Sequence, residues 1–315
     1  MLKNHMNRDK IILICLLRGK KMFRWMNKIN NNILICNINI PGTHDSCSFR
    51  VQFPFLSKCQ QTTIAQQLNS GIRFLDIRVE KDGEKLKIVH DIADCKNPAN
   101  RRKTLHLESV ISDCKRFLSE NPSETILFSY KRDDGASQEE TFDTFFKNYL
   151  EKDPVWYREN RIPVLKEVRG NIVLLNRDNI DKNNEKYNDF NTGINLSTWV
   201  YQKENVERIY EVAELLNRDG AITGKTFTVQ DLYGLTPQKK WNLAILPFIK
   251  KPPETNDVLI TFFSCGSIFY NPKRSAKYIN KKLSDITLEK TKKYGWIIMD
   301  YPTEKFIKEI INSNF

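Results

Sequence analysis

The sequence predicts an α/β fold in which a mostly parallel sheet closes into a single barrel. Short apolar runs of strand length alternate along the chain with segments whose apolar residues recur at helical spacing. Six or more such strands separated by helices indicate a parallel sheet, either doubly wound or closed into a barrel. Ionisable residues follow many of these runs directly, and a barrel gathers the carboxyl ends of its strands at one mouth. A chain of 315 residues fits one such domain with insertions.

Residues 1–21 differ from the rest of the chain. A basic opening leads into the apolar run 11–17, which is followed by the basic stretch 18–21. The run is at the short limit for a signal peptide, has no small-residue cleavage site and is too short to span a bilayer. We therefore interpret 1–21 as an unstructured leader or a weak signal-like segment, and we expect the domain to occupy 22–315.

The first part of this domain alternates between strand and helix patterns. The run 34–40 is rich in β-branched residues and ends at Pro41-Gly42, which indicates a strand followed by a turn. The segment 62–71 has the pattern of a short helix, and two more strands are expected at 72–79 and 86–92. A longer helix follows, with Thr104 as its expected N-cap and an apolar stripe of Leu107, Val110, Ile111, Cys114, Phe117 and Leu118.

The later strands are predicted from apolar runs that are mostly separated by helical stretches. They lie at 125–130, 171–176, 197–202, 258–264 and 295–300. No clear linker divides the chain, and the proline-containing segment 251–257 is expected to be a loop. The ionisable residues at the ends of the predicted strands are His44, Asp45, Asp76, Arg78, His90, Lys131, Arg177 and Asp300.

The chain is basic, with 50 Lys and Arg residues against 38 Asp and Glu residues and a net charge of +12. An excess of this size favours acidic partners such as an anionic membrane face or a phosphorylated ligand. The basic residues are dispersed through loops such as 179–188 and are not gathered on one helix with aromatic residues between them. We therefore expect no nucleic-acid partner.

Seven cysteines occur, an odd number without CxxC pairs or zinc-finger spacing. This pattern argues against a disulfide framework and against a structural zinc site. Cys36 and Cys114 lie in apolar patterns, so we expect them to be small buried side chains.

Two of the four histidines follow apolar runs and stand beside carboxylates, in the pairs His44-Asp45 and His90-Asp91. Arg78 lies between them in the sequence. A general base, a general acid and a fixed positive charge are the groups that phosphoryl transfer needs when no metal takes part. A single histidine of this kind would more often have a structural role, but two of them flanking an arginine favour catalysis.

At this point the sequence resembles a known family, the bacterial phosphatidylinositol-specific phospholipases C with their X domain. The resemblance runs in order from about Trp25 to the C-terminus and implies an irregular TIM-type barrel. The segments that carry it are 39-NIPGTHDS-46, 71-GIRFLDIRV-79, 119-SENPSETILFSYK-131, 169-RGNIVLLNR-177, 227-FTVQDLY-233 and 292-KKYGWIIMDY-301.

The resemblance also implies the catalytic residues. His44 matches the general base that removes the proton of the inositol 2-hydroxyl, and Asp300 matches the carboxylate that orients this base. His90 matches the general acid that protonates the departing diacylglycerol oxygen, assisted by Asp45. Arg78 matches the cation that stabilises the phosphorane, with Asp76 beside it. The implied products are diacylglycerol and inositol 1,2-cyclic phosphate.

The implied inositol contacts are Lys131, Arg177, Asp231 and Tyr233, which supply charged groups for the ring hydroxyls and one aromatic face. The substrate is either free phosphatidylinositol or a glycosylated form. The sequence differs from the family pattern at the residue after the expected general acid, where the family has a glycine and this chain has Asp91. The segment 179–225 matches the family poorly, so the outer contour of the site is left open.

The resemblance implies no metal and no other cofactor, because Arg78 stands where eukaryotic relatives bind calcium. It further implies a secreted or peripheral membrane protein that acts as a monomer on a phosphatidylinositol-containing surface. Phe49, Phe53, Phe55 and Leu56 follow the catalytic turn, where the family has a rim helix. Of these, Phe53, Phe55 and Leu56 are the expected membrane contacts.

Two other functions remain open. A metal-dependent glycerophosphodiester phosphodiesterase would be expected to carry a Glu-x-Asp motif where this chain has Asp76-Ile77-Arg78. A catalytically silent barrel that binds lipid or inositol phosphate would have no need of both histidines together with Arg78 and Asp300. A turnover assay separates these alternatives.

Overall fold

The computed structural model describes residues 24–133, 138–180, 184–200, 202–203, 206–217, 219–255, 257–266 and 269–315. The proposed leader at 1–21 lies outside these residues, so the domain boundary at residue 22 stays a prediction.

Parallel strands form the body of the sheet, in the order β7-β5-β2-β1-β12-β11-β10. The first strand therefore pairs with the last, and Ile40 lies opposite Trp296. This neighbourhood was expected for a closed barrel. The strands are β1 Ile40–Thr43, β2 Phe74–Asp82, β5 Ile126–Arg132, β7 Ile172–Asn176, β10 Ile222–Gln230, β11 Val258–Phe262 and β12 Trp296–Met299.

The barrel is irregular on one side, between β7 and β10. The short strands β6 (Trp156–Tyr157) and β8 (Ile194–Asn195) pair with β7, and β9 (Glu211–Leu216) pairs antiparallel with β10. Within the described residues no strand pairing joins the two groups. Hydrogen bonds from side chains cross the gap instead, from Thr198 Oγ1 to the Glu214 carbonyl at 2.9 Å and from Asn160 Nδ2 to the Leu216 carbonyl at 2.8 Å.

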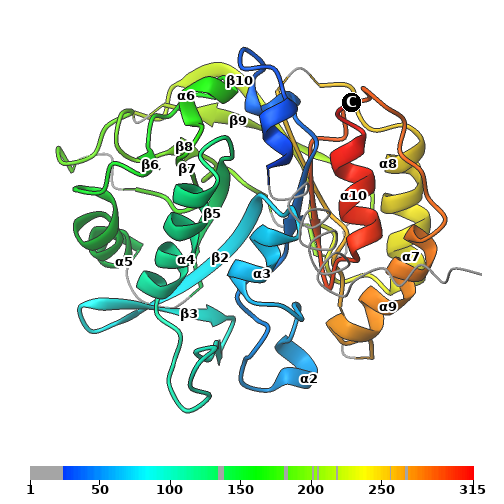
Figure 1. The fold of residues 1–315 in the computed structure, drawn as a ribbon, viewed down its shortest axis with the longest axis horizontal. Helices are drawn as coiled ribbons and strands as arrows, with labels where there is room; N and C mark the ends of the chain where they lie inside the picture. The colour runs from blue at the N-terminus through cyan, green and yellow to red at the C-terminus, as the bar shows by residue number, and fades with distance from the viewer. Residues whose placement is uncertain are drawn as a thin grey trace, which may run out of the picture.

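Helices connect the strands and cover the outside of the sheet (Figure 1). None of the described helices is both long and apolar enough to cross a bilayer. The helices are η1 Trp25–Lys28, η2 Ile35–Asn37, α2 Pro54–Ser57, α3 Ile64–Asn69, α4 Leu107–Glu120, α5 Gln138–Phe145, η3 Phe146–Leu150, α6 Leu165–Val168, α7 Pro237–Lys240, η4 Trp241–Ile245, α8 Leu246–Lys250, α9 Pro272–Leu283 and α10 Glu304–Asn312. An arm formed by β3 (Lys85–His90) and β4 (Ala93–Asp94) extends from β2.

The close packing around Gly42 in β1 explains why this position is a glycine. A Cβ atom at this position would lie 2.7 Å from Ile298 Cδ1 and 2.8 Å from the Cβ of Phe74. Any side chain would therefore push β1 away from its two neighbours, β12 and β2. The absence of a side chain lets the first strand sit between them and carry His44 to the mouth of the barrel.

The helical stripe predicted for α4 is confirmed, because all six of its apolar residues are buried. The N-cap is His106 and the predicted Thr104 is wrong; Thr104 lies in an isolated bridge with Lys96. The cysteine prediction is also confirmed for Cys36 and Cys114, and the four other described cysteines are buried as well.

Two predicted strands are wrong. In the run 34–40, only Ile40 belongs to a strand, and Ile35–Asn37 form a 3-10 turn whose Ile35 carbonyl accepts a hydrogen bond from Trp296 Nε1 at 3.3 Å. The run is apolar because it closes the amino-terminal end of the barrel, and burial alone does not require strand pairing. The described part of 197–202 also forms no strand, and Trp199 is buried against Arg177.

The β9 and β10 hairpin was not predicted as such. The residues of β9 are mostly half-buried and do not alternate between buried and exposed, and the first four residues of β10 are exposed. The periodicity that identifies a buried strand therefore begins only near Phe227.

Candidate active site

The carboxyl ends of the strands surround a cavity of about 710 Å³. Residues from both halves of the chain line it, which confirms the expectation that the strand ends meet at one mouth. Its ionisable and aromatic lining residues include His44, Arg78, His90, Lys131, Asp133, Asp231, Tyr233 and Asp300.

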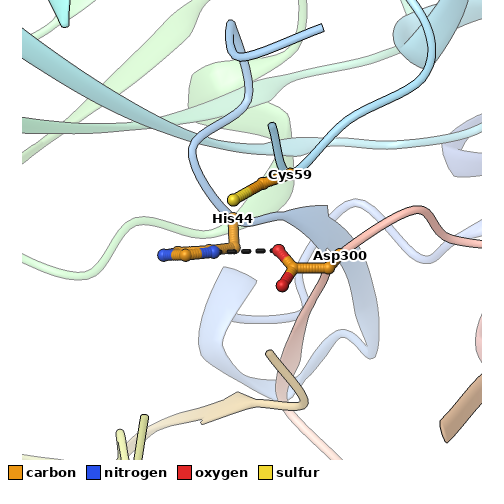
Figure 2. A group of neighbouring side chains, drawn as sticks. All are labelled: His44, Cys59 and Asp300. Atoms are coloured by element: carbon orange, nitrogen blue, oxygen red, sulfur yellow. Dashed lines mark hydrogen bonds and ion pairs between the residues drawn. The ribbon is translucent and has the colours of Figure 1, made fainter. Parts of the chain in front are cut away.

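His44 and Asp300 are in direct contact although 256 positions separate them in the sequence. His44 follows β1, Asp300 follows β12, and the pairing of these two strands brings His44 Nδ1 to 2.9 Å from Asp300 Oδ1. Figure 2 shows the imidazole edge facing this carboxylate. Burial lowers the pKa of His44, but the charges of Asp45 and Asp300 outweigh burial and raise it to about 9. Burial in turn raises the pKa of Asp300.

Asp45 holds both histidines and the arginine. Its backbone is in the left-handed region with φ of 41°, a conformation that aspartate tolerates better than most residues. One carboxylate oxygen, Oδ2, lies 3.1 Å from His44 Nε2 and 3.1 Å from His90 Nε2. The other, Oδ1, lies 2.9 Å from Arg78 Nε. This buried carboxylate therefore fixes the relative positions of the three groups.

Arg78 is the positive centre of the site. Its Nη2 lies 3.2 Å from His44 Nε2 and 3.4 Å from Asp76 Oδ2, while Nη1 lies 3.5 Å from Asp133 Oδ2. Burial lowers the pKa of the guanidinium, but the surrounding carboxylates raise it well above its usual value, so Arg78 stays charged. Burial raises the pKa of Asp76, but the charges of Arg78 and Arg177 outweigh burial and lower it.

His90 presents its Nε2 to Asp45, because its other ring nitrogen is occupied. Nδ1 lies 2.6 Å from the carbonyl oxygen of Ser57, which can only accept a hydrogen bond. Nδ1 therefore carries a hydrogen, and Nε2 is the atom that can exchange a proton with a bound molecule. The next residue, Asp91, adopts a left-handed backbone with φ of 54°, a conformation that glycine adopts most readily.

Three of the four expected headgroup residues lie at the main cavity. Lys131 and Asp231 line it, and Tyr233 does so with 40% of its surface exposed. The fourth, Arg177, is buried between Trp199 and Asp76, with its guanidinium carbon 3.9 Å from the indole centroid and Nη1 3.4 Å from Asp76 Oδ1. It lines a neighbouring cavity of about 270 Å³, which Lys131 also lines.

Asp133 was missed by the sequence analysis. Its Oδ1 lies 2.6 Å from Lys131 Nζ, its Oδ2 lies 3.5 Å from Arg78, and it also accepts a hydrogen bond from the Asp91 backbone. The pKa of this carboxyl is raised by burial but lowered further by Arg78 and Lys131, so its net shift is downward. Its only sequence signal is its place two residues after Lys131, just beyond the end of a strand.

Lys240 and Gln60 were also missed. Gln60 donates to the carbonyls of His44 and Met299, at 2.6 and 3.0 Å, and so joins the ends of β1 and β12. Lys240 is fully buried, and its Nζ donates to Gln230 Oε1 at 2.6 Å and to the Leu232 carbonyl at 2.9 Å, on both sides of Asp231. Burial lowers the pKa of Lys240 to about 8.

The site also contains donor groups that could be considered as metal ligands, including the set His44, Cys59 and Asp300 drawn in Figure 2. These residues fit a cation poorly. Burial and the nearby carboxylates raise the pKa of Cys59 well above its usual value, which opposes the thiolate that a metal needs. The guanidinium of Arg78 already stands 3.2 Å from His44 Nε2 and would repel a second cation.

Comparison with known proteins finds one family and its members. Residues 38–178 match the family described as phosphatidylinositol-specific phospholipase C, X domain. The chain is 29% identical to a 1-phosphatidylinositol phosphodiesterase of Staphylococcus aureus, over 94% of this chain and 95% of that protein. It is 25% identical to the protein of the same name from Listeria monocytogenes, over 100% of this chain and 99% of that protein.

A solved structure agrees with these matches. The phosphatidylinositol-specific phospholipase C of Staphylococcus aureus superposes with a TM-score of 0.74 at 27% identity, covering 94% of this chain and 99% of that one. Over nearly its whole length the chain is therefore similar to the bacterial phosphatidylinositol-specific phospholipases C, and it shares their TIM-type fold.

Proposed function

We propose that this chain is a metal-independent phospholipase C that cleaves phosphatidylinositol to diacylglycerol and inositol 1,2-cyclic phosphate. The observation that carries the proposal is the arrangement of its two histidines. Their ring centroids lie 6.0 Å apart on either side of the Asp45 carboxylate, and each ring is held by its own second partner, Asp300 for His44 and Ser57 for His90.

The reaction needs one proton acceptor and one proton donor. His44 Nε2 accepts the proton of the inositol 2-hydroxyl, and that oxygen forms a new bond to the phosphorus. The bond between phosphorus and the glycerol oxygen breaks, and the leaving oxygen takes a proton from His90 Nε2. The products are neutral diacylglycerol and a cyclic phosphodiester, and the two histidines exchange their protonation states.

Asp300 and Arg78 support this transfer in different ways. The Asp300 carboxylate fixes the ring of His44 through Nδ1 and stabilises the imidazolium that forms, as in other His and Asp pairs. Arg78 offers a planar fork of donors to the phosphate oxygens, whose charge grows as the phosphorane forms. Asp45 and Asp76 hold the guanidinium in place through contacts of 2.9 and 3.4 Å.

The headgroup contacts follow from the lining of the cavity. Lys131 and Asp231 can bind ring hydroxyls, and Tyr233 offers a half-exposed aromatic face. Arg177 supports Asp76 directly, and it reaches the headgroup only on the side of the neighbouring cavity. These lining residues decide whether the enzyme prefers free phosphatidylinositol or a glycosylated form.

The partner surface is a membrane that contains phosphatidylinositol. Phe53, Phe55 and Leu56 have 61%, 71% and 61% of their surfaces exposed, on and next to α2, and Leu56 lines the cavity. These large apolar side chains at the mouth suit insertion at a lipid interface. Phe49, the first aromatic residue of this stretch, is buried and belongs to the protein interior. A monomeric state and the absence of nucleic-acid binding stay predictions.

One experiment tests the reaction directly. The protein is incubated with phosphatidylinositol in excess chelator, and phosphorus NMR follows the products. We expect a cyclic phosphodiester signal. No turnover under any condition would support the silent barrel, and turnover that returns only when a divalent metal is added would support the metal-dependent alternative.

A further inference from the structure

A second cavity of about 270 Å³, the side cavity, adjoins the main one on the side of the gap in the barrel. Its wall is formed by residues at the carboxyl ends of β5 and β7 and by the segment that follows β8. Lys131 lines both cavities. A substituent on a headgroup bound in the main cavity can therefore extend past this side chain into the side cavity.

The side cavity is lined mainly by groups that bind anions. Three cations, Lys131, Arg132 and Arg177, contribute to its wall, and Asn179 and Ser197 add an amide and a hydroxyl. The cations come from the ends of two neighbouring parallel strands, β5 and β7. Positive charge gathered in one recess attracts a negatively charged ligand.

Asp178 is the one carboxyl on this wall among the residues that the structure describes. It is only 6% exposed, and its Oδ1 accepts a hydrogen bond from the backbone N–H of Arg132 at 3.1 Å. Its Oδ2 is also buried and has no hydrogen-bond partner in the described part of the chain. Burial raises the pKa of Asp178 to about 6, although Arg132, Lys131 and Arg177 oppose this rise. A buried oxygen without a partner in the protein indicates that a ligand atom belongs beside it.

A phosphate monoester matches these groups chemically. Its second pKa is also about 6, so the monoester and Asp178 can share one proton in an O–H···O hydrogen bond. The cations are then available to the other phosphate oxygens, which suit the planar fork of an arginine. A neutral sugar could use the amide and the hydroxyl but would gain little from three cations.

The reaction itself leaves Arg132 and Asp178 unused. Neither residue lines the main cavity, where the two histidines and Arg78 stand. Arg132 is therefore the cation of the side cavity that can be changed without touching the catalytic groups.

We infer that the side cavity binds a phosphate monoester on the inositol ring, so that this chain accepts phosphatidylinositol phosphates as well as phosphatidylinositol. The inference rests on the proposed function, because the ring has to lie in the main cavity for its substituent to enter the side cavity. The ring positions concerned are 3, 4 and 5, since positions 1 and 2 carry the reacting oxygens and position 6 adjoins position 1.

Calorimetric titration with soluble headgroups tests the inference. The ligands are inositol 1-phosphate, the three inositol bisphosphates whose second phosphate is at position 3, 4 or 5, and inorganic phosphate. Hydrogen bonds to a charged group are among the stronger ones, so we expect at least one bisphosphate to bind about tenfold more tightly than inositol 1-phosphate. No turnover takes place, so a failure of the proposed reaction alone does not change the result.

Two arginine variants form a matched pair. Arg132→Gln removes a cation of the side cavity, whereas Arg116→Gln removes one from the outside of α4, where it contacts Asp113. Arg132→Gln should bring the binding of the bisphosphate to within about twofold of that of inositol 1-phosphate. Arg116→Gln should keep the tenfold difference, because distant exposed charges are screened. Thermal unfolding checks that both variants are folded.

Asp178→Asn tests the shared proton independently of the arginines. The amide exchanges the unpaired oxygen for an N–H donor and keeps the acceptor for the Arg132 backbone. We expect this variant to bind the bisphosphate at least as tightly as the wild type does. A ligand that donates to the carboxylate, such as a sugar hydroxyl, would instead be bound less tightly.

The outcomes separate the inference from the proposed function. Tighter binding of a bisphosphate that is lost in Arg132→Gln and kept in Arg116→Gln and Asp178→Asn supports the inference. It would be overturned if no bisphosphate bound more tightly than inositol 1-phosphate, if both arginine variants lost the same amount, or if inorganic phosphate alone bound as tightly as the bisphosphate. Binding of no inositol phosphate at all would contradict the headgroup site of the proposed function as well.

Discussion

The two sides of the cavity are built on different principles. On the side of β1, β2 and β5, charged groups contact one another directly: Asp45, Asp76 and Asp133 surround Arg78 at 2.9 to 3.5 Å. On the side of β10, the backbone N–H of Asp231 donates to Gln202 Oε1, and the buried ammonium of Lys240 donates to Gln230 Oε1 and to the Leu232 carbonyl on either side of Asp231. The first side fixes charges before a substrate arrives, and the second fixes the shape of a loop.

This difference indicates which property each side contributes. A preorganised set of charges stabilises a transition state without rearrangement, so changes there should reduce turnover. A loop that is positioned by packing sets how the headgroup is held, so changes there should act mainly on KM. Asp300 follows the last strand, β12, and not β1, β2 or β5. It nevertheless belongs to the group of contacting charges, because it contacts His44.

The largest effect is expected for His44→Ala. Loss of the general base should reduce kcat for phosphatidylinositol by about 10²–10⁴-fold. His106→Ala is the matched control, since this histidine contacts Asp82 on the outer arm, away from the cavity. Equal rates for His44→Ala and the control would remove His44 from the mechanism.

Arg78→Lys should be the next most harmful change. Lysine keeps the charge but loses the planar fork that contacts Asp45, Asp76 and the phosphate, so we expect kcat to fall about 10- to 100-fold. Comparison with Arg78→Gln separates charge from geometry. If Arg78→Lys retains full turnover while Arg78→Gln does not, charge alone is sufficient.

Asp300→Asn should change both the rate and its pH dependence. His44 acts as a base only when neutral, so kcat/KM should rise with pH towards the His44 pKa of about 9. Removing the Asp300 charge lowers that pKa, so this limb should move to lower pH while the plateau falls about tenfold. A pH profile of kcat/KM for the two proteins measures the shift, and an unmoved limb would contradict the pairing of these residues.

Lys240→Met should give the smallest effect and test the loop side. It removes the donor to Gln230 and Leu232 without touching the cavity, and an unsatisfied buried acceptor costs about 1–3 kcal/mol. We expect KM to rise several-fold with little change in kcat. Its exposed neighbour on the same helix gives the control Lys239→Met. A fall in kcat with no change in KM would contradict the claim that the β10 side of the cavity acts mainly on headgroup binding.

The side of the charges could be predicted largely from the sequence. His44, Asp76, Arg78 and Asp300 follow or lie within short apolar strands, and the periodicity of such strands is a local signal. Their meeting follows from the pairing of the first strand, β1, with its neighbours β2 and β12. Asp133 could not be predicted, because no periodic sequence pattern distinguishes a functional aspartate in a loop from an aspartate exposed to solvent.

The loop side could not be predicted as well, for physical reasons. Lys240 lies in a stretch that looks like the polar face of a helix, and only the tertiary packing shows that it is buried. Arg177 was expected in the cavity, yet its stacking on Trp199 depends on the irregular segment that replaces the predicted strand 197–202. The run 34–40 was wrongly predicted to be a strand, because an apolar segment that closes the end of a barrel has the same sequence pattern as a buried strand.

The central claim is that the two histidines have opposite proton roles, and one measurement tests it most directly. His44→Ala and His90→Ala are each compared with the wild type on phosphatidylinositol and on a nitrophenyl ester of inositol phosphate, whose leaving group needs no proton. A missing acid matters only when the leaving oxygen must be protonated, so His90→Ala should be slow on the lipid and close to wild type on the ester. His44→Ala should be slow on both, because both substrates need the 2-hydroxyl to be deprotonated. Equal losses on the two substrates for His90→Ala, or rescue of His44→Ala by the ester, would contradict the assignment.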